Sequence, residues 1–169
     1  MLNRRQFALG AAAGAVSAGA TPLSALAGTP TQVALVIDAM GEIREVYTDE
    51  LCREMIDSGL NSVTVTLCDP KSYEQQAYDW GMAGVLEYDR LIEAESEFWT
   101  KATTVADIDR ARDEDRIALF YLFQNSTQFG RDLDNVDVFY GLGVRSSQIT
   151  YNFQNWAGAG CNELNDSGL

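Results

Sequence analysis

The chain has 169 residues, with 12 basic and 25 acidic side chains, no histidine and a formal net charge of −13 at pH 7. This excess of acid argues against nucleic acid or an anionic membrane as a partner, because both repel a negatively charged protein. The length fits one domain or part of one.

The first 27 residues have the parts of a bacterial export signal in the required order. A twin-arginine pattern at residues 4–5 is followed by an apolar run rich in alanine and glycine, and a small-x-small cleavage site occupies residues 25–27. The run is too short and too weakly apolar to favour a stable membrane span. We therefore expect residues 1–27 to be read by the twin-arginine export machinery, and residues 28–169 to be a periplasmic protein.

Three cysteines are an odd number for an oxidising compartment, and none of them has CxxC spacing. A disulfide between two of them leaves three pairings open. Proteins exported by the twin-arginine route generally fold before they cross the membrane, which disfavours a required disulfide. We expect Cys52, Cys68 and Cys161 to act as small apolar residues.

The exported part alternates strand-like and helix-like segments. Apolar, β-branched runs predict strands at residues 33–37, 61–67, 117–123 and 144–149, the first of them buried on both faces. Cap and stop signals predict helices at residues 48–59, 71–101 with breaks near Gly81 and Gly84, 104–114, and 133–140. In the last helix, we expect Leu133, Val136 and Phe139 or Tyr140 to face the core. Repeated strand and helix units imply parallel strands joined by right-handed crossovers, an α/β fold.

Polar residues gather where the fourth predicted strand ends, at Thr150, Tyr151, Asn152 and Asn155. The carboxyl ends of parallel strands are where α/β folds hold their chemistry. A loop with turn-forming asparagines is the alternative interpretation.

This region carries a resemblance. The run Gly-Leu-Gly-Val-Arg at residues 141–145, then Ile-Thr-Tyr-Asn and an asparagine-containing loop, resembles the middle of the membrane dipeptidase (renal dipeptidase) family of zinc peptidases. That family folds as a (β/α)8 barrel with a two-metal site at the carboxyl ends of its strands. The resemblance implies a hydrolase of dipeptides or related small amides.

The resemblance also implies roles for particular positions. Met40 stands where the family has a zinc-binding histidine, Glu42 where it has a zinc-binding aspartate, and Gln124 where it has a glutamate that bridges the two metals. Tyr151 occupies the position of a histidine that contacts the substrate. The loop after it, with Asn152 and Asn155, would line the substrate pocket.

These replacements make a normal two-zinc site a poor expectation. A neutral glutamine amide cannot supply the anionic bridge between two cations, and a thioether is a weaker zinc ligand than imidazole. A single metal held by Glu42 together with residues of a further half of the protein stays open. Purely structural roles are the alternative for these positions. Asp38 and Glu42 would accept loop N–H bonds at a strand end, and Gln124 and Asn125 would be turn residues. Arg145 would pair with an acid.

A (β/α)8 barrel needs about 250 residues and eight strands to close, whereas four strands are predicted here. We therefore interpret residues 28–169 as the N-terminal half of a dipeptidase-like barrel that is inactive alone. The alternatives are a non-catalytic periplasmic protein that binds a small ligand, and a complete open-sheet domain. A homodimer is also left open.

Overall fold

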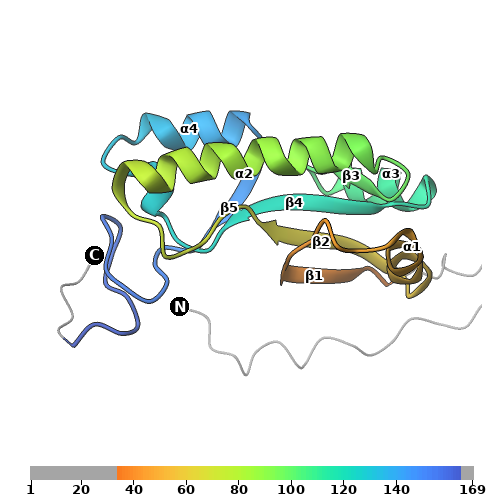
Figure 1. Ribbon diagram of the computed structural model, residues 1–169, viewed down its shortest axis with the longest axis horizontal. Helices are drawn as coiled ribbons and strands as arrows, with labels where there is room; N and C mark the ends of the chain where they lie inside the picture. The colour runs from red at the N-terminus through yellow and green to blue at the C-terminus, as the bar shows by residue number, and fades with distance from the viewer. Residues whose placement is uncertain (1–33, 165–169) are drawn as a thin grey trace, which may run out of the picture. The chain divides into compact units, whose positions relative to one another are not determined.

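The computed structural model describes residues 34–164, and the predicted export signal lies outside them. The described part is a parallel sheet with helices (Figure 1). The elements in chain order are β1 (Val36–Gly41), α1 (Asp49–Asp57), β2 (Leu60–Thr66), α2 (Glu74–Ala94), β3 (Trp99–Lys101), α3 (Ala106–Asp113), β4 (Ile117–Phe123), the 3-10 helix η1 (Thr127–Phe129), α4 (Asp134–Gly141) and β5 (Val144–Ser147). Within these residues, no helix is long and apolar enough to cross a membrane.

The sheet confirms the predicted α/β fold with parallel strands. Its order is β1-β2-β4, and the second edge of β4 is shared by β3, which pairs with the start of β4, and β5, which pairs with its end. The four predicted strands correspond to β1, β2, β4 and β5. The short strand β3 lies inside the segment predicted as helix, so that prediction was wrong from Trp99 to Lys101.

Alternate residues of β4 face two different layers. Leu119, Tyr121 and Phe123 pack in one cluster with Val85 of α2 and Phe139 of α4, so these two helices cover the same face. The intervening residues Ala118 and Phe120 pack with Ile108 and Ala111 of α3 instead. Because successive side chains of a strand point to opposite faces, α3 covers the start of the other face.

Helix α2 runs unbroken through Gly81 and Gly84, where breaks were predicted. Both glycines are buried against the sheet layer. A Cβ built on Gly84 would lie 2.0 Å from the carbonyl oxygen of Leu67. The glycines therefore permit close packing of the helix against the chain below it, rather than ending the helix.

Strand β1 is exposed, although its apolar run predicted burial on both faces. Within the described residues it begins at Val36, and Val36 and Ile37 are 49% and 50% exposed. Among the described residues β1 pairs only with β2. An apolar, β-branched run favours a strand by itself, but burial also requires neighbours on both faces.

Helix α4 contacts the core through one side chain. Phe139 is buried among the rings of Tyr78, Phe123 and Phe129. Leu133 and Val136, predicted to face inward, are 80% and 41% exposed. Phe139 is the one buried residue of this eight-residue helix, so the helix buries less of its apolar face than the periodicity predicts.

Arg145 of β5 pairs with no acid among the described residues, contrary to the expectation. Its guanidinium donates to the carbonyl oxygens of Thr103, Tyr140 and Val144 and lies over the ring of Tyr140. It therefore joins β5 to α4 and to the segment that precedes α3.

The cysteines of the described part are all free thiols. Cys52 is buried, as expected of a small apolar residue. Cys68 is half-buried, and burial raises the pKa of its thiol. Cys161 is exposed, so the expectation of an apolar packing role is wrong there.

The carboxylate of Asp107 stabilises the start of α3. Its Oδ2 accepts hydrogen bonds from the backbone N–H groups of Thr103 and Thr104, each at 2.8 Å, as the acidic residue of a capping box does. These bonds, with Arg110 nearby, lower the pKa of Asp107 from 3.8 to about 2.

Because the folded-state pKa of Asp107 lies below the unfolded value, the stability that this group adds is present above about pH 4 and is lost as the pH falls toward 2. We expect Asp107→Asn to lower the free energy of unfolding by about 1 kcal/mol at pH 7. Urea unfolding of both proteins at pH 7 and at about pH 2.5 measures this effect. A difference that stays the same at both pH values would contradict it.

Asp89 of α2 supports a buried phenol. Its Oδ1 accepts hydrogen bonds from the hydroxyl of Tyr121 and from Lys101 Nζ, both at 2.7 Å, and burial with this carboxylate raises the pKa of Tyr121. We expect Asp89→Ala to cost about 2 kcal/mol of stability, because it leaves the Tyr121 hydroxyl without an acceptor. Thermal unfolding of both single variants and the double variant tests this. Tyr121→Phe should destabilise the Asp89→Ala variant less than it destabilises the parent protein, and an equal loss of stability in both would mean that the two groups do not interact.

Candidate functional site

Strands β1, β2 and β4 run parallel, so their carboxyl ends meet at one edge of the sheet. A cavity of about 370 Å³ lies there, and we call it the mouth cavity. Its lining consists of Met40, Gly41, Glu42, Thr66, Cys68, Asp69, Pro70 and Gln124. The structure thus brings together the three positions that the resemblance assigned to metal binding: Met40, Glu42 and Gln124.

The end of β1 is shaped by local hydrogen bonding. The Asp38 carboxylate accepts a hydrogen bond from the backbone N–H of Met40 at 3.0 Å, and because both residues lie within β1 the donor is a strand N–H and not the loop N–H of the sequence interpretation. A Cβ on Gly41 would lie 2.5 Å from Asp38 Oδ2 and 2.9 Å from Val63 Cγ1. Glycine at this position, the last residue of β1, therefore leaves room for the Asp38 carboxylate and the Val63 side chain just before Glu42.

Glu42 is paired on the protein surface. Its carboxylate forms an ion pair and hydrogen bond with Arg44, and 53% of its side chain is exposed. The interpretation that Glu42 accepts loop N–H bonds at a strand end is therefore wrong. An exposed pair of this kind is worth at most about 1 kcal/mol, so a ligand could separate it at small cost.

The loop after β4 is tied to the loop after β2. Asn125 is buried, donates to the carbonyl oxygen of Pro70 and accepts the backbone N–H of Thr127 at 2.8 Å. Asn125 is therefore a turn residue, as one interpretation held. Gln124, the residue before it, lines the mouth cavity together with Cys68, which had no site role in the sequence interpretation.

Thr66, Cys68 and Asp69 were missed as lining residues of the mouth cavity. Their positions could have indicated this role, because they lie at the end of the alternating strand pattern of residues 61–67, directly before Pro70. The resemblance assigned site roles only at the ends of the neighbouring strands.

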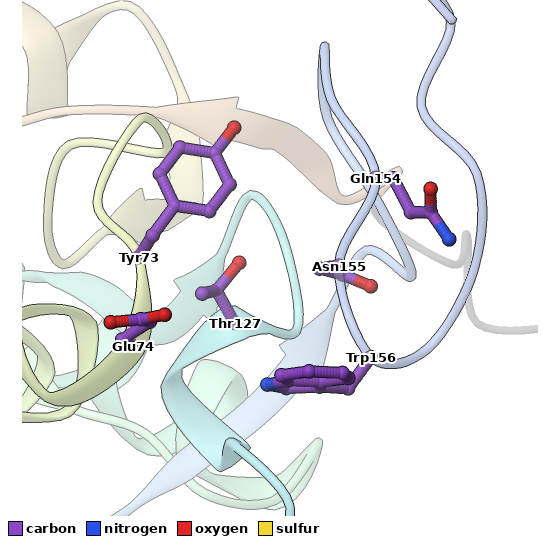
Figure 2. Close-up of a pocket in the computed structure, with 6 residues that line it drawn as sticks. All are labelled: Tyr73, Glu74, Thr127, Gln154, Asn155 and Trp156. Atoms are coloured by element: carbon purple, nitrogen blue, oxygen red, sulfur yellow. The ribbon is translucent and has the colours of Figure 1, made fainter.

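Tyr151, Asn152 and Asn155 do not line the mouth cavity. Tyr151 is exposed, and the carbonyl oxygen of Asn152 accepts the backbone N–H of Asn162 at 2.9 Å. The Asn155 amide is used by its own loop, since Oδ1 accepts the N–H groups of Ala157 and Gly158 and Nδ2 donates to a backbone carbonyl. Asn155 does line a second cavity, of about 460 Å³ (Figure 2).

The donors at the mouth cavity do not fit a two-metal centre. Among residues 34–164, no group of three or more histidine, cysteine, aspartate or glutamate side chains could hold a metal ion. Gln124 offers a neutral oxygen, Met40 a thioether, and the carboxylate of Glu42 is paired with Arg44. Two adjacent divalent cations require anionic bridging oxygen, which these three side chains do not provide.

Several solved structures resemble this fold. A crystal structure of an amidohydrolase from Pseudomonas aeruginosa aligns with a TM-score of 0.69 and 29% identity, covering 80% of this chain and 39% of the other. A probable dipeptidase from P. aeruginosa aligns at a TM-score of 0.59 and 16% identity, covering 72% and 36%. A metallopeptidase from Rhodobacter sphaeroides, liganded with a phosphinate mimic of the dipeptide L-Ala-D-Ala, aligns at 0.61 and 14% identity, covering 70% and 46%.

The chain thus spans less than half the length of each of these three proteins. No curated protein sequence matched it. A family model described as membrane dipeptidase (peptidase family M19) matches residues 32–169, nearly the whole of the predicted exported part. The chain belongs to the membrane dipeptidase family.

Proposed function

We propose that this protein is a periplasmic, dipeptidase-like hydrolase of dipeptides or related small amides, and that residues 28–169 form the N-terminal half of its barrel and are inactive alone. The observation that carries the proposal is the mouth cavity itself. It lies where β1, β2 and β4 end together, which is where barrel enzymes hold their substrates. The relatives add the substrate class, since their descriptions name dipeptidases and a dipeptide mimic.

The half-barrel part of the proposal is supported by an unpaired edge of the sheet. Strand β1 has one partner among the described residues, and Leu35, Val36 and Ile37 leave a large part of their apolar surface exposed. A free strand edge is a ready template for another strand. Further βα units would cover it, carried on the same polypeptide, on a separate one or on a second copy of this chain.

A second candidate is a non-catalytic protein that binds a small ligand at the same cavity. Met40 and Gln124 favour it, because both replace stronger metal ligands at the family positions. In that case the barrel mouth would hold the ligand without hydrolysing it.

The test uses the complete gene product, purified from the periplasm, with a panel of dipeptides. Hydrolysis that a chelator abolishes would support the first candidate and exclude the second. Dipeptide binding in calorimetry without turnover, with or without added zinc, would support the second. A protein that neither binds nor cleaves any dipeptide would contradict both.

A further inference from the structure

A second cavity lies beside the mouth cavity, and we call it the side cavity (Figure 2). Its lining consists of Tyr73, Glu74, Thr127, Gln154, Asn155 and Trp156. Tyr73 and Glu74 stand at the start of α2, Thr127 begins η1, and the other three belong to the loop after β5. Segments that follow three strands, β2, β4 and β5, therefore meet around it.

One buried polar group in the wall of the side cavity has no partner among the described residues. Thr127 is 3% exposed, and its Oγ1 forms no hydrogen bond among the described residues. Figure 2 shows this hydroxyl pointing toward the space between the ring of Tyr73 and Asn155. A buried hydroxyl without a partner costs about 1 to 3 kcal/mol, and a ligand with a hydrogen-bonding group there would remove that cost.

The charge of the side cavity favours a cation. Glu74 is the only charged residue in its lining, and its carboxylate has no hydrogen bond or ion pair within the described part of the chain. Trp156 adds an indole ring, seen nearly edge-on in Figure 2 with one face toward Thr127. The guanidinium of Arg131 lies 3.7 Å from the centre of that ring and lines a neighbouring cavity that Glu74 and Trp156 also line, so the ligand charge must be met by Glu74 rather than by the indole face.

A carboxylate, neutral oxygens and an aromatic face are the groups that bind an ammonium ion. Donors of an ammonium group would find acceptors in the Glu74 carboxylate and the Thr127 hydroxyl, whereas the Tyr73 hydroxyl points away from Glu74 in Figure 2. The net charge of −13 adds a long-range attraction for cationic ligands.

The spacing between the two cavities limits what can span them. Gln124 of the mouth cavity and Thr127 of the side cavity are three residues apart, and such a segment extends over at most about 11 Å. This distance is within the length of one extended dipeptide whose amide lies in the mouth cavity, counting its backbone and a long side chain together. Lysine has both the length and the ammonium group.

We propose, building on the proposed function, that the side cavity binds the side-chain ammonium group of the substrate, so that the protein prefers dipeptides that contain lysine. Glu74 supplies the charge, Thr127 a hydrogen bond and Trp156 an apolar wall. The preference acts on binding at the side cavity and is separate from the chemistry at the mouth cavity.

The test measures binding to the complete gene product by calorimetry. The probes are alanyl-lysine and lysyl-alanine, with the same dipeptides containing norleucine, which keeps most of the side-chain length without the charge. We expect one lysine dipeptide to bind about tenfold more tightly than its norleucine counterpart. Glu74→Gln should reduce that ratio about fivefold, and Thr127→Val should reduce it by a smaller factor.

Glu93→Gln is the matched control, because Glu93 is exposed on the same helix, is unpaired within the described residues and lies outside the side cavity. It should leave the ratio unchanged. Equal binding of lysine and norleucine dipeptides would overturn this inference and leave the proposed function standing. A lysine preference that is the same in the Glu74→Gln variant would also overturn the inference and leave the proposed function standing. No binding of any dipeptide would overturn both.

Discussion

Replacing Gly84 by alanine is expected to lower the free energy of unfolding by about 3 kcal/mol or more. An ideal Cβ at this position lies 2.0 Å from the carbonyl oxygen of Leu67 and 2.8 Å from its carbonyl carbon. Both atoms are backbone, so no rotation of a side chain relieves the clash. Helix α2 would have to move away from β2, opening the cluster that contains Val85 and Tyr88.

Gly141→Ala is the matched control. Gly141 ends helix α4, and a Cβ there would meet no atom within 4 Å. Since alanine favours the helix more than glycine does, this variant should be unchanged or up to about 1 kcal/mol more stable. Urea unfolding compares the two variants with the parent protein. If Gly84→Ala were as stable as Gly141→Ala, α2 could not be packed against Leu67 as the structure describes.

The glycines of α2 show why part of the fold could not be predicted from the sequence. Glycine weakens an isolated helix, so Gly81 and Gly84 predicted breaks. Their role depends on the distance between the helix and β2, which no local pattern records. The strand Ile117–Phe123, by contrast, was predicted with its observed bounds, because six of its seven residues are buried and its apolar run is continuous.

The short strand β3 was missed for a related reason. Trp99 to Lys101 pair with Ile117 to Leu119, and three residues are too few to show a period of two. Their strand character comes from that pairing. The exposed strand β1 is the reverse case, since its apolar pattern predicted the strand while its burial depended on neighbours.

The candidate site was predictable to the extent that it lies at strand ends. Strand endings and the resemblance led to Met40, Glu42 and Gln124, which line one cavity. A binding role for Thr127 could not be predicted from the sequence, because only the folded structure shows that its hydroxyl has no hydrogen-bond partner among the described residues. Asn155 was predicted as a substrate contact, and in the structure its amide is occupied by its own loop.

The second large effect concerns the metal. We expect the double variant Met40→His with Gln124→Glu, made in the complete gene product, to bind zinc at least about tenfold more tightly than the parent protein. Both substitutions lie in the mouth cavity beside Glu42, so the variant offers an imidazole and two carboxylates. The pair between Glu42 and Arg44 is exposed, and its loss costs little compared with a zinc bond.

The control for this variant adds the same two side chains where they cannot converge. Gln76→Glu with Leu86→His places them on exposed positions of α2, ten residues and about 15 Å apart along the helix. It should bind zinc no better than the parent protein in competition with a colorimetric chelator. An equal gain in both double variants would mean that added charge, rather than geometry, attracts the metal. No gain in the mouth-cavity variant would mean that positions 40, 42 and 124 do not converge on one ion, and the assignment of these positions from the family would then be wrong.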